Sequence, residues 1–234
     1  MTTEASKKFD EFMMKLASDM HGSCEDWLSG REFRADASQF IAAAFAGRSL
    51  ALLDAMERLV EERWDATGAL LRVLVESAIN GIVVALGGPE EAARLDSEQT
   101  AQLVSFAEAN CLVYEPSVAE SGKRARKFDQ QVQRAEELLM VHNVSSTSAF
   151  KMDTYNHVYK LTSLSEVHGI ATTAPYCGPG LRISTRPAPS DTLARATYLS
   201  MAVPYVAIQF SVLGDVLGDS VPGLRDIESR WLDL

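Results

Sequence analysis

Reactive side chains and sequence motifs are scarce in this chain. Its 234 residues include only four histidines, which argues against a histidine-rich metal site. It has no GxGxxG, GxxxxGKS or GxxxxGKT, the phosphate-binding loops of nucleotide enzymes. It also lacks GxSxG, HExxH and Glu-x-x-His, which serve nucleophilic serines, zinc and di-iron centres. With no signature for a nucleotide enzyme, a serine hydrolase or a metalloenzyme, we expect neither a cofactor nor a metal.

The cysteines indicate a reducing compartment. Cys24, Cys111 and Cys177 are odd in number, far apart, and form no CxxC pair. This pattern is typical of free thiols rather than of a disulfide framework. The first residues, MTTEASKKFDEF, contain no apolar stretch of the kind found in a signal peptide. We therefore expect a cytoplasmic protein.

Uninterrupted hydrophobic runs are also missing. The two most apolar runs, 69–86 and 196–213, are each broken by polar or helix-disturbing residues, so we expect no membrane span. The interrupting residues are Arg72, Glu76 and Asn80 in the first run and Pro204 and Gln209 in the second.

The overall composition predicts a globular protein with a substantial core. Hydrophobic residues make up 47% of the chain and charged residues 23%. The formal net charge of −10 favours solubility and argues against a broad phosphate-binding surface.

Apolar spacings of three and four residues predict an all-α fold of about seven helices. We expect a single domain over 1–234, with its core at 36–218 and an amphipathic helix, 4–28, packed on it. Two strongly apolar helices, 69–86 and 192–217, should lie at the centre. Because several helices are apolar beyond one face, we also expect a homo-oligomer.

Glycine and proline mark the expected breaks. Gly87–Gly88–Pro89 should end the first central helix, and Pro204 should kink the second. The Pro- and Gly-rich stretch 170–190 is predicted to be a long loop, of a length that is typical of functional or mobile segments.

Three polar residues on the central helix 69–86 form the most informative pattern. At about 100° per residue, Arg72, Glu76 and Asn80 share one stripe of an otherwise apolar helix. One interpretation is a narrow solvent-facing stripe with an i,i+4 ion pair. The other is a buried polar seam, in which Arg72 neutralises Glu76 and a facing helix supplies hydrogen bonds.

A helix expected over 150–168 could face this seam. His168 lies at the end of this helix. Ser165 comes three residues before His168, and Tyr159 comes nine residues before it. A histidine next to Glu76 would form a general acid/base pair, with Arg72 holding an oxyanion. The candidate catalytic residues are thus Glu76, His168 and Arg72, and the candidate substrate-binding residues are Asn80, Tyr159 and Ser165. Alternatively, His168 only bonds Glu76 across the core, or the two residues share a metal.

A basic run lies just beyond the middle of the chain. Lys123, Arg124, Arg126 and Lys127 lie on the expected outer face of a helix over 118–141. Such a run is usually a solvated face, and the alternative is a contact with an anion or a nucleic acid.

The spacings of these candidate residues resemble those of a bacterial all-helical family of unknown function. The resemblance rests on Arg-x3-Glu (Arg72, Glu76) followed by Tyr-x5-Ser-x2-His (Tyr159, Ser165, His168), and it covers roughly residues 40–170. That family is loosely similar to the HEPN group, which implies a ribonuclease of a toxin or phage-defence system. The chain lacks the Arg-x4–6-His motif with which that group cuts RNA.

Three functions remain open at this point. The first is a cytosolic helical factor of the toxin or phage-defence type that acts on RNA or a partner protein. The second is a small-molecule enzyme or binding protein that uses the Arg/Glu/His seam beneath the 170–190 loop. The third is a structural or oligomerisation protein without an active site.

Overall fold

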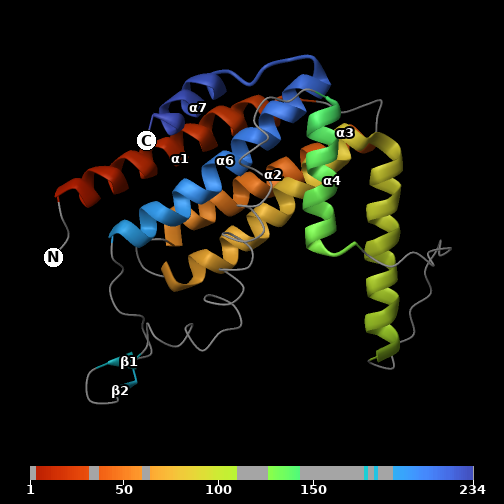
Figure 1. Ribbon diagram of the computed structural model, residues 1–234, viewed down its shortest axis with the longest axis horizontal. Coiled ribbons are helices and arrows are strands. Elements are labelled where there is room, and N and C mark those ends of the chain that lie inside the picture. Colours follow the sequence, from red (N-terminus) through yellow and green to blue (C-terminus); the bar gives the residue numbers. More distant parts are fainter. Residues whose placement is uncertain are drawn as a thin grey trace.

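The computed structural model describes residues 4–31, 37–59, 64–109, 126–142, 177–178, 182–183 and 192–233 (Figure 1). Helices dominate this part of the chain, which confirms the all-α class. It contains six helices rather than about seven, and the helix expected over 150–168 lies outside the described residues. The helices are α1 (Glu4–Ser29), α2 (Ala37–Leu59), α3 (Trp64–Ala109), α4 (Phe128–Val141), α6 (Thr192–Leu217) and α7 (Leu224–Leu232).

Two short strands are the exception within the expected loop 170–190. They are β1 (Cys177–Gly178) and β2 (Arg182–Ile183), which pair antiparallel with Cys177 opposite Ile183.

The two apolar helices α3 and α6 occupy the centre, as expected. Helix α2 packs on α3 and α6, α1 packs on α6 and α2, and α7 covers α1 and α6 (Figure 1). Leu71, Ile79 and Ile82 of α3 and Phe210 of α6 are fully buried. Hydrophobic side chains all round both helices find partners on several neighbours, which is why neither shows a polar face of normal width.

Helix α3 bends at the predicted glycines. Gly88 has φ 66° and ψ −153°, a conformation that favours glycine because it has no Cβ. Figure 1 shows the second segment of α3 leaving the bundle in a new direction after this bend, with α4 lying next to it. From Pro89 the helix continues to Ala109 without another break.

A side chain of α7 compensates for the proline within α6. Proline has no backbone N–H, so Pro204 leaves the carbonyl of Ser200 without its helical donor. The indole Nε1–H of Trp231 donates to that carbonyl oxygen at 3.2 Å. The C-terminal helix thereby satisfies a backbone group that the proline sets free.

We expect Trp231→Phe to lower the free energy of unfolding by about 1 kcal/mol beyond the loss of ring packing, because the Ser200 carbonyl loses its donor. Urea unfolding of this variant should be compared in two backgrounds, wild type and Pro204→Ala. With alanine at 204 a backbone donor returns, so the same tryptophan substitution should cost less. Equal costs in the two backgrounds would contradict the assignment.

Two helical stretches, Ala66–Asp96 and Ala196–Leu217, are long and apolar enough to cross a membrane. More than half of the most apolar window in each is buried inside the protein. The core helix of a soluble protein passes the same test of length and composition.

Candidate functional site

The expected seam on α3 contains the predicted ion pair. Arg72 Nε donates to Glu76 Oε1 at 3.4 Å, and the side chains are 22% and 36% exposed. The pair therefore lies at the edge of the bundle, between the solvated stripe and the buried seam that the sequence left open. An i,i+4 pair with this exposure contributes little to stability by itself.

Asn80 faces α4. The side chain of Gln131, which is buried, donates from Nε2 to Asn80 Oδ1 at 3.0 Å. A facing helix, α4, thus supplies a hydrogen bond to the seam. Tyr159, Ser165 and His168 lie outside the described residues, so the pairing of His168 with Glu76 stays a prediction.

One turn beyond the bend in α3, three arginines converge on a buried carboxylate. We call Glu91, Arg94, Arg126 and Arg134 the arginine cluster. Arg94 Nε and Arg126 Nη1 donate to Glu91 Oε2 at 2.7 and 2.9 Å. Arg134 Nε and Arg126 Nη2 donate to Glu91 Oε1 at 2.8 and 3.3 Å. Each of the two carboxylate oxygens therefore accepts two charge-assisted hydrogen bonds.

Gln131 joins the cluster to the seam. Its Oε1 accepts from Arg94 Nη2 at 3.1 Å and from Arg126 Nη1 at 3.2 Å, while its amide nitrogen binds Asn80. A continuous chain of hydrogen bonds consequently runs from Asn80 to Glu91 across the α3–α4 contact.

The electrostatics of the cluster follow from this geometry. Burial by itself would raise the pKa of Glu91, but hydrogen bonds from Arg126, Arg94 and Arg134 outweigh it and lower this pKa to about 2. Glu137, an exposed residue of α4, also accepts from Arg134 Nη1, at 3.2 Å. In the described part of the chain, the arginine cluster thus has the buried carboxylate of Glu91 at its centre and the exposed carboxylate of Glu137 at its rim.

Two glycines place Glu91. Gly88 supplies the positive φ of the bend, and Gly87 leaves room for the glutamate side chain. A Cβ at position 87 would lie 2.4 Å from Glu91 Cγ and 3.5 Å from Leu138 Cδ1. The pair of glycines predicted as a helix stop therefore also permits the close approach of α3 and α4.

Gly87→Ala should lower the free energy of unfolding by about 1–3 kcal/mol, because the added methyl group overlaps Glu91. Gly22→Ala is the matched control, since nothing lies within 4 Å of a Cβ at that position in α1. It should raise the stability by about 0.5–1 kcal/mol through helix propensity alone. Thermal or urea unfolding measures both effects, and the same sign for the two variants would contradict the prediction.

Sequence reasoning missed the arginine cluster. No motif in the sequence marks Glu91, and the sequence predicts Arg126 on the outer face of a helix over 118–141. That assignment was wrong for Arg126: α4 begins at Phe128, Lys127 has extended backbone, and the Arg126 side chain turns inward to Glu91. Lys123 and Arg124 lie outside the described residues. The i,i+3 spacing of Glu91 and Arg94 was the one local signal.

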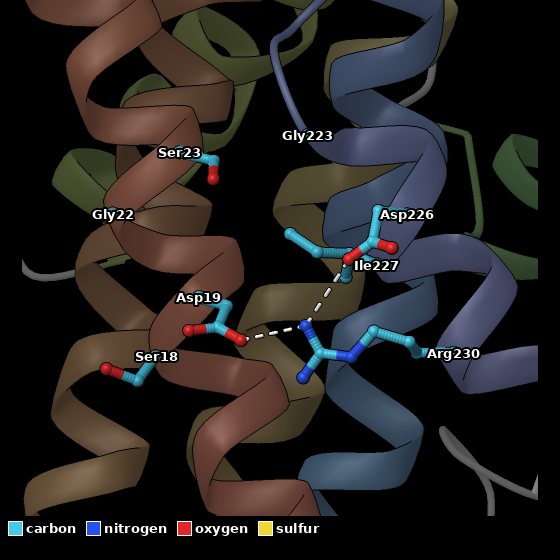
Figure 2. A pocket seen from close by; sticks show the side chains of 8 residues that line it. All are labelled: Ser18, Asp19, Gly22, Ser23, Gly223, Asp226, Ile227 and Arg230. Atoms are coloured by element: carbon cyan, nitrogen blue, oxygen red, sulfur yellow. Dashed lines mark hydrogen bonds and ion pairs between the residues drawn. The ribbon is translucent and has the colours of Figure 1, made fainter.

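A second polar region lies between α1 and α7. Figure 2 shows the Arg230 guanidinium between Asp19 of α1 and Asp226 of α7. Its Nη1 lies 2.8 Å from Asp19 Oδ2 and 3.5 Å from Asp226 Oδ2. These side chains line an open hollow of about 410 Å³, and none of the predicted site residues contributes to it. The remaining lining residues are Ser18, Gly22, Ser23, Gly223 and Ile227.

Metal binding has no obvious place in the described part of the protein. Among the described side chains, no three or more histidines, cysteines, aspartates or glutamates are grouped so that they could bind one metal ion.

Comparisons of this chain with protein-family models, with curated proteins and with solved structures find no match. The resemblance to the bacterial helical family accordingly remains a prediction.

Proposed function

We propose that this chain is a cytosolic helical factor of the toxin or phage-defence type that binds RNA, with the arginine cluster as its phosphate contact. The observation that carries the proposal is the convergence of Arg94, Arg126 and Arg134 on one side of the α3–α4 junction. Guanidinium groups match phosphate oxygens in shape and charge, and they are the preferred residues for such contacts.

The internal hydrogen bonds leave part of this charge available. Among the described residues, no hydrogen bond involves Arg126 Nε or Arg134 Nη2, whereas the other guanidinium nitrogens of these two side chains donate to Glu91, Gln131 or Glu137. A guanidinium that is already fixed on one edge loses little conformational freedom when a phosphate binds the other edge. The cluster is therefore preorganised for an oxyanion.

The acidity of the rest of the chain sets the expected strength. With net charge −10, the protein repels RNA over most of its surface, so binding should be confined to the arginine cluster. If the cluster contacts one phosphate of the strand, or a second one beside it as well, the logarithm of the association constant should fall against the logarithm of salt concentration with a slope of about −0.7 to −1.4.

Fluorescence anisotropy with a labelled single-stranded RNA tests the proposal. Arg126→Gln should weaken binding about tenfold, a typical loss for one charge-assisted phosphate contact. Arg58→Gln is the matched control, because Arg58 is an exposed arginine of α2 that is paired with Asp54 away from the cluster. Absence of RNA binding by the wild-type protein at low salt, or equal affinities of the two variants, would refute the proposal.

A structural role is the second candidate, and one observation favours it. The amides of Asn80 and Gln131 pair with each other, and Gln131 in turn accepts from two arginines. In this second candidate function, the network has one role, which is to fix α4 in register on α3. In that case Arg126→Gln lowers the melting temperature, but there is no RNA affinity for it to change.

A further inference from the structure

We propose that Arg94, Arg126 and Arg134 form a site for a single phosphate group, and that Glu91 fills this site in the free protein as an internal competitor. The inference rests on the proposed function and adds to it the ligand group and the means by which the site is regulated.

The ratio of arginines to carboxylates favours an anion with more charge than a carboxylate. One arginine is enough to neutralise a carboxylate, yet three guanidiniums donate to Glu91, and Arg126 alone uses two nitrogens for this. Glu137 balances Arg134 at the exposed rim, yet three like charges around one buried carboxylate still repel one another, which is unfavourable for a purely structural ion pair. A phosphate dianion carries more charge and more acceptor oxygens than a carboxylate, so it balances three guanidiniums better.

The arginines are more exposed to solvent than Glu91 is. The Glu91 side chain is only 7% exposed, whereas those of Arg94, Arg126 and Arg134 are 16%, 26% and 35% exposed. An anion that arrives from solvent meets the guanidiniums before it meets the carboxylate. It can therefore bind to the outer edges of Arg126 and Arg134 first and then compete for the inner edges.

A glycine close to Glu91 in the chain provides a way to displace the carboxylate. Glu91 comes three residues after Gly88, whose backbone has φ 66°. Glycine tolerates large changes of backbone angles at small energetic cost. A change at Gly88 would move Glu91, together with Arg94 on the same helical segment, away from Arg126 and Arg134 without unwinding the part of α3 that lies in the bundle. Protonation offers no such route, because the pKa of Glu91 of about 2 keeps this carboxylate charged at neutral pH.

Isothermal titration of the full chain with inorganic phosphate tests the inference, with sodium chloride at equal ionic strength as the blank. Glu91→Gln should bind phosphate about tenfold or more tighter than the wild type, because one negative charge leaves the site. Asp19→Asn is the matched control: it removes a carboxylate from Arg230 instead and should leave phosphate affinity unchanged. Equal affinities of wild type and Glu91→Gln would overturn the inference.

Glu137→Gln provides a second test in case Glu91→Gln does not fold. This substitution frees Arg134 at the exposed rim and keeps the buried carboxylate in place. It should raise phosphate affinity by roughly two- to threefold, as expected for a weakened surface charge, and an unchanged affinity would count against the inference. The gain in either variant should disappear when Arg126→Gln is added.

A competition arm separates the two sources of phosphate and the two proposals. If phosphate in an RNA strand is the ligand, inorganic phosphate should displace labelled RNA from the wild-type protein, and Glu91→Gln should hold RNA more tightly. RNA binding that depends on Arg126 without any gain in Glu91→Gln would refute only the internal competitor. Phosphate binding by Glu91→Gln without RNA binding by any form would refute only the RNA-binding function.

Discussion

Replacing Glu91 with alanine should lower the free energy of unfolding by about 3–5 kcal/mol, the usual effect of removing one partner from a buried ion pair. Arg94, Arg126 and Arg134 would keep their charges at the α3–α4 junction without the carboxylate that balances them. Urea unfolding at pH 7 measures the difference. Glu137→Ala is the control, because its ion pair with Arg134 is exposed and should contribute no more than about 1 kcal/mol.

The same variant gives a pH signature whose sign is fixed by the Glu91 pKa. This pKa falls from 4.5 to about 2 on folding, so the unfolded chain binds the proton more readily than the folded protein does. The stabilisation by Glu91 is thus complete above about pH 4.5 and disappears as the pH falls toward 2. The difference in stability between wild type and Glu91→Ala should shrink over that window. A difference that is small at pH 7, or constant down to pH 2, would contradict the role of Glu91.

Gln209→Met should raise the free energy of unfolding by about 1–3 kcal/mol, because burying an amide without hydrogen bonds costs about this much. Gln209 lies in the middle of α6 and is buried. Among the residues that the structure describes, neither its Nε2 nor its Oε1 has a hydrogen-bond partner. Methionine has a similar length and shape and carries no polar group that needs a partner.

Gln131→Met is the matched comparison for this prediction. It makes the same substitution at another buried glutamine, but that amide binds Asn80, Arg94 and Arg126. Its removal should lower stability, by about 1–3 kcal/mol, because partners are left unsatisfied. Thermal unfolding should therefore move in opposite directions for the two variants. A lower stability of Gln209→Met would contradict the assignment of Gln209 as an unpaired amide.

The fit of Gln209 in the core also depends on a glycine. A Cβ on Gly81 of α3 would lie 2.2 Å from Gln209 Nε2 and 3.1 Å from Phe45 Cβ. Because Gly81 has no side chain, the crossing of α2, α3 and α6 has room for the side chain of Gln209.

Helical periodicity was sufficient to predict the main features of the fold. The central helices α3 and α6 are apolar all round in the sequence, and the bend in α3 follows directly from Gly87 and Gly88. The ion pair of Arg72 with Glu76 was also predictable, because residues four apart meet on the surface of a helix. These features depend on neighbours in sequence, whose relative positions are fixed once the helix is assigned.

The partners across helices could not be predicted in the same way. Gln131 reaches Asn80 from 51 residues further along the chain, and Arg126 and Arg134 reach Glu91 from 35 and 43 residues away. Which helix faces a polar stripe depends on how the hydrophobic faces of all the helices pack together. Periodicity gives each face but not its neighbour, so the sequence did not identify α4 as a partner of Asn80.

The link between Pro204 and Trp231 has a consequence for how this chain can vary. The indole is needed at the Ser200 carbonyl only because the proline withholds a donor there. A relative with any other residue at position 204 would regain that donor and release position 231 from its requirement for an N–H group. Among homologous chains these two positions, 27 residues apart, should therefore change together, and tryptophan should persist at 231 wherever proline persists at 204.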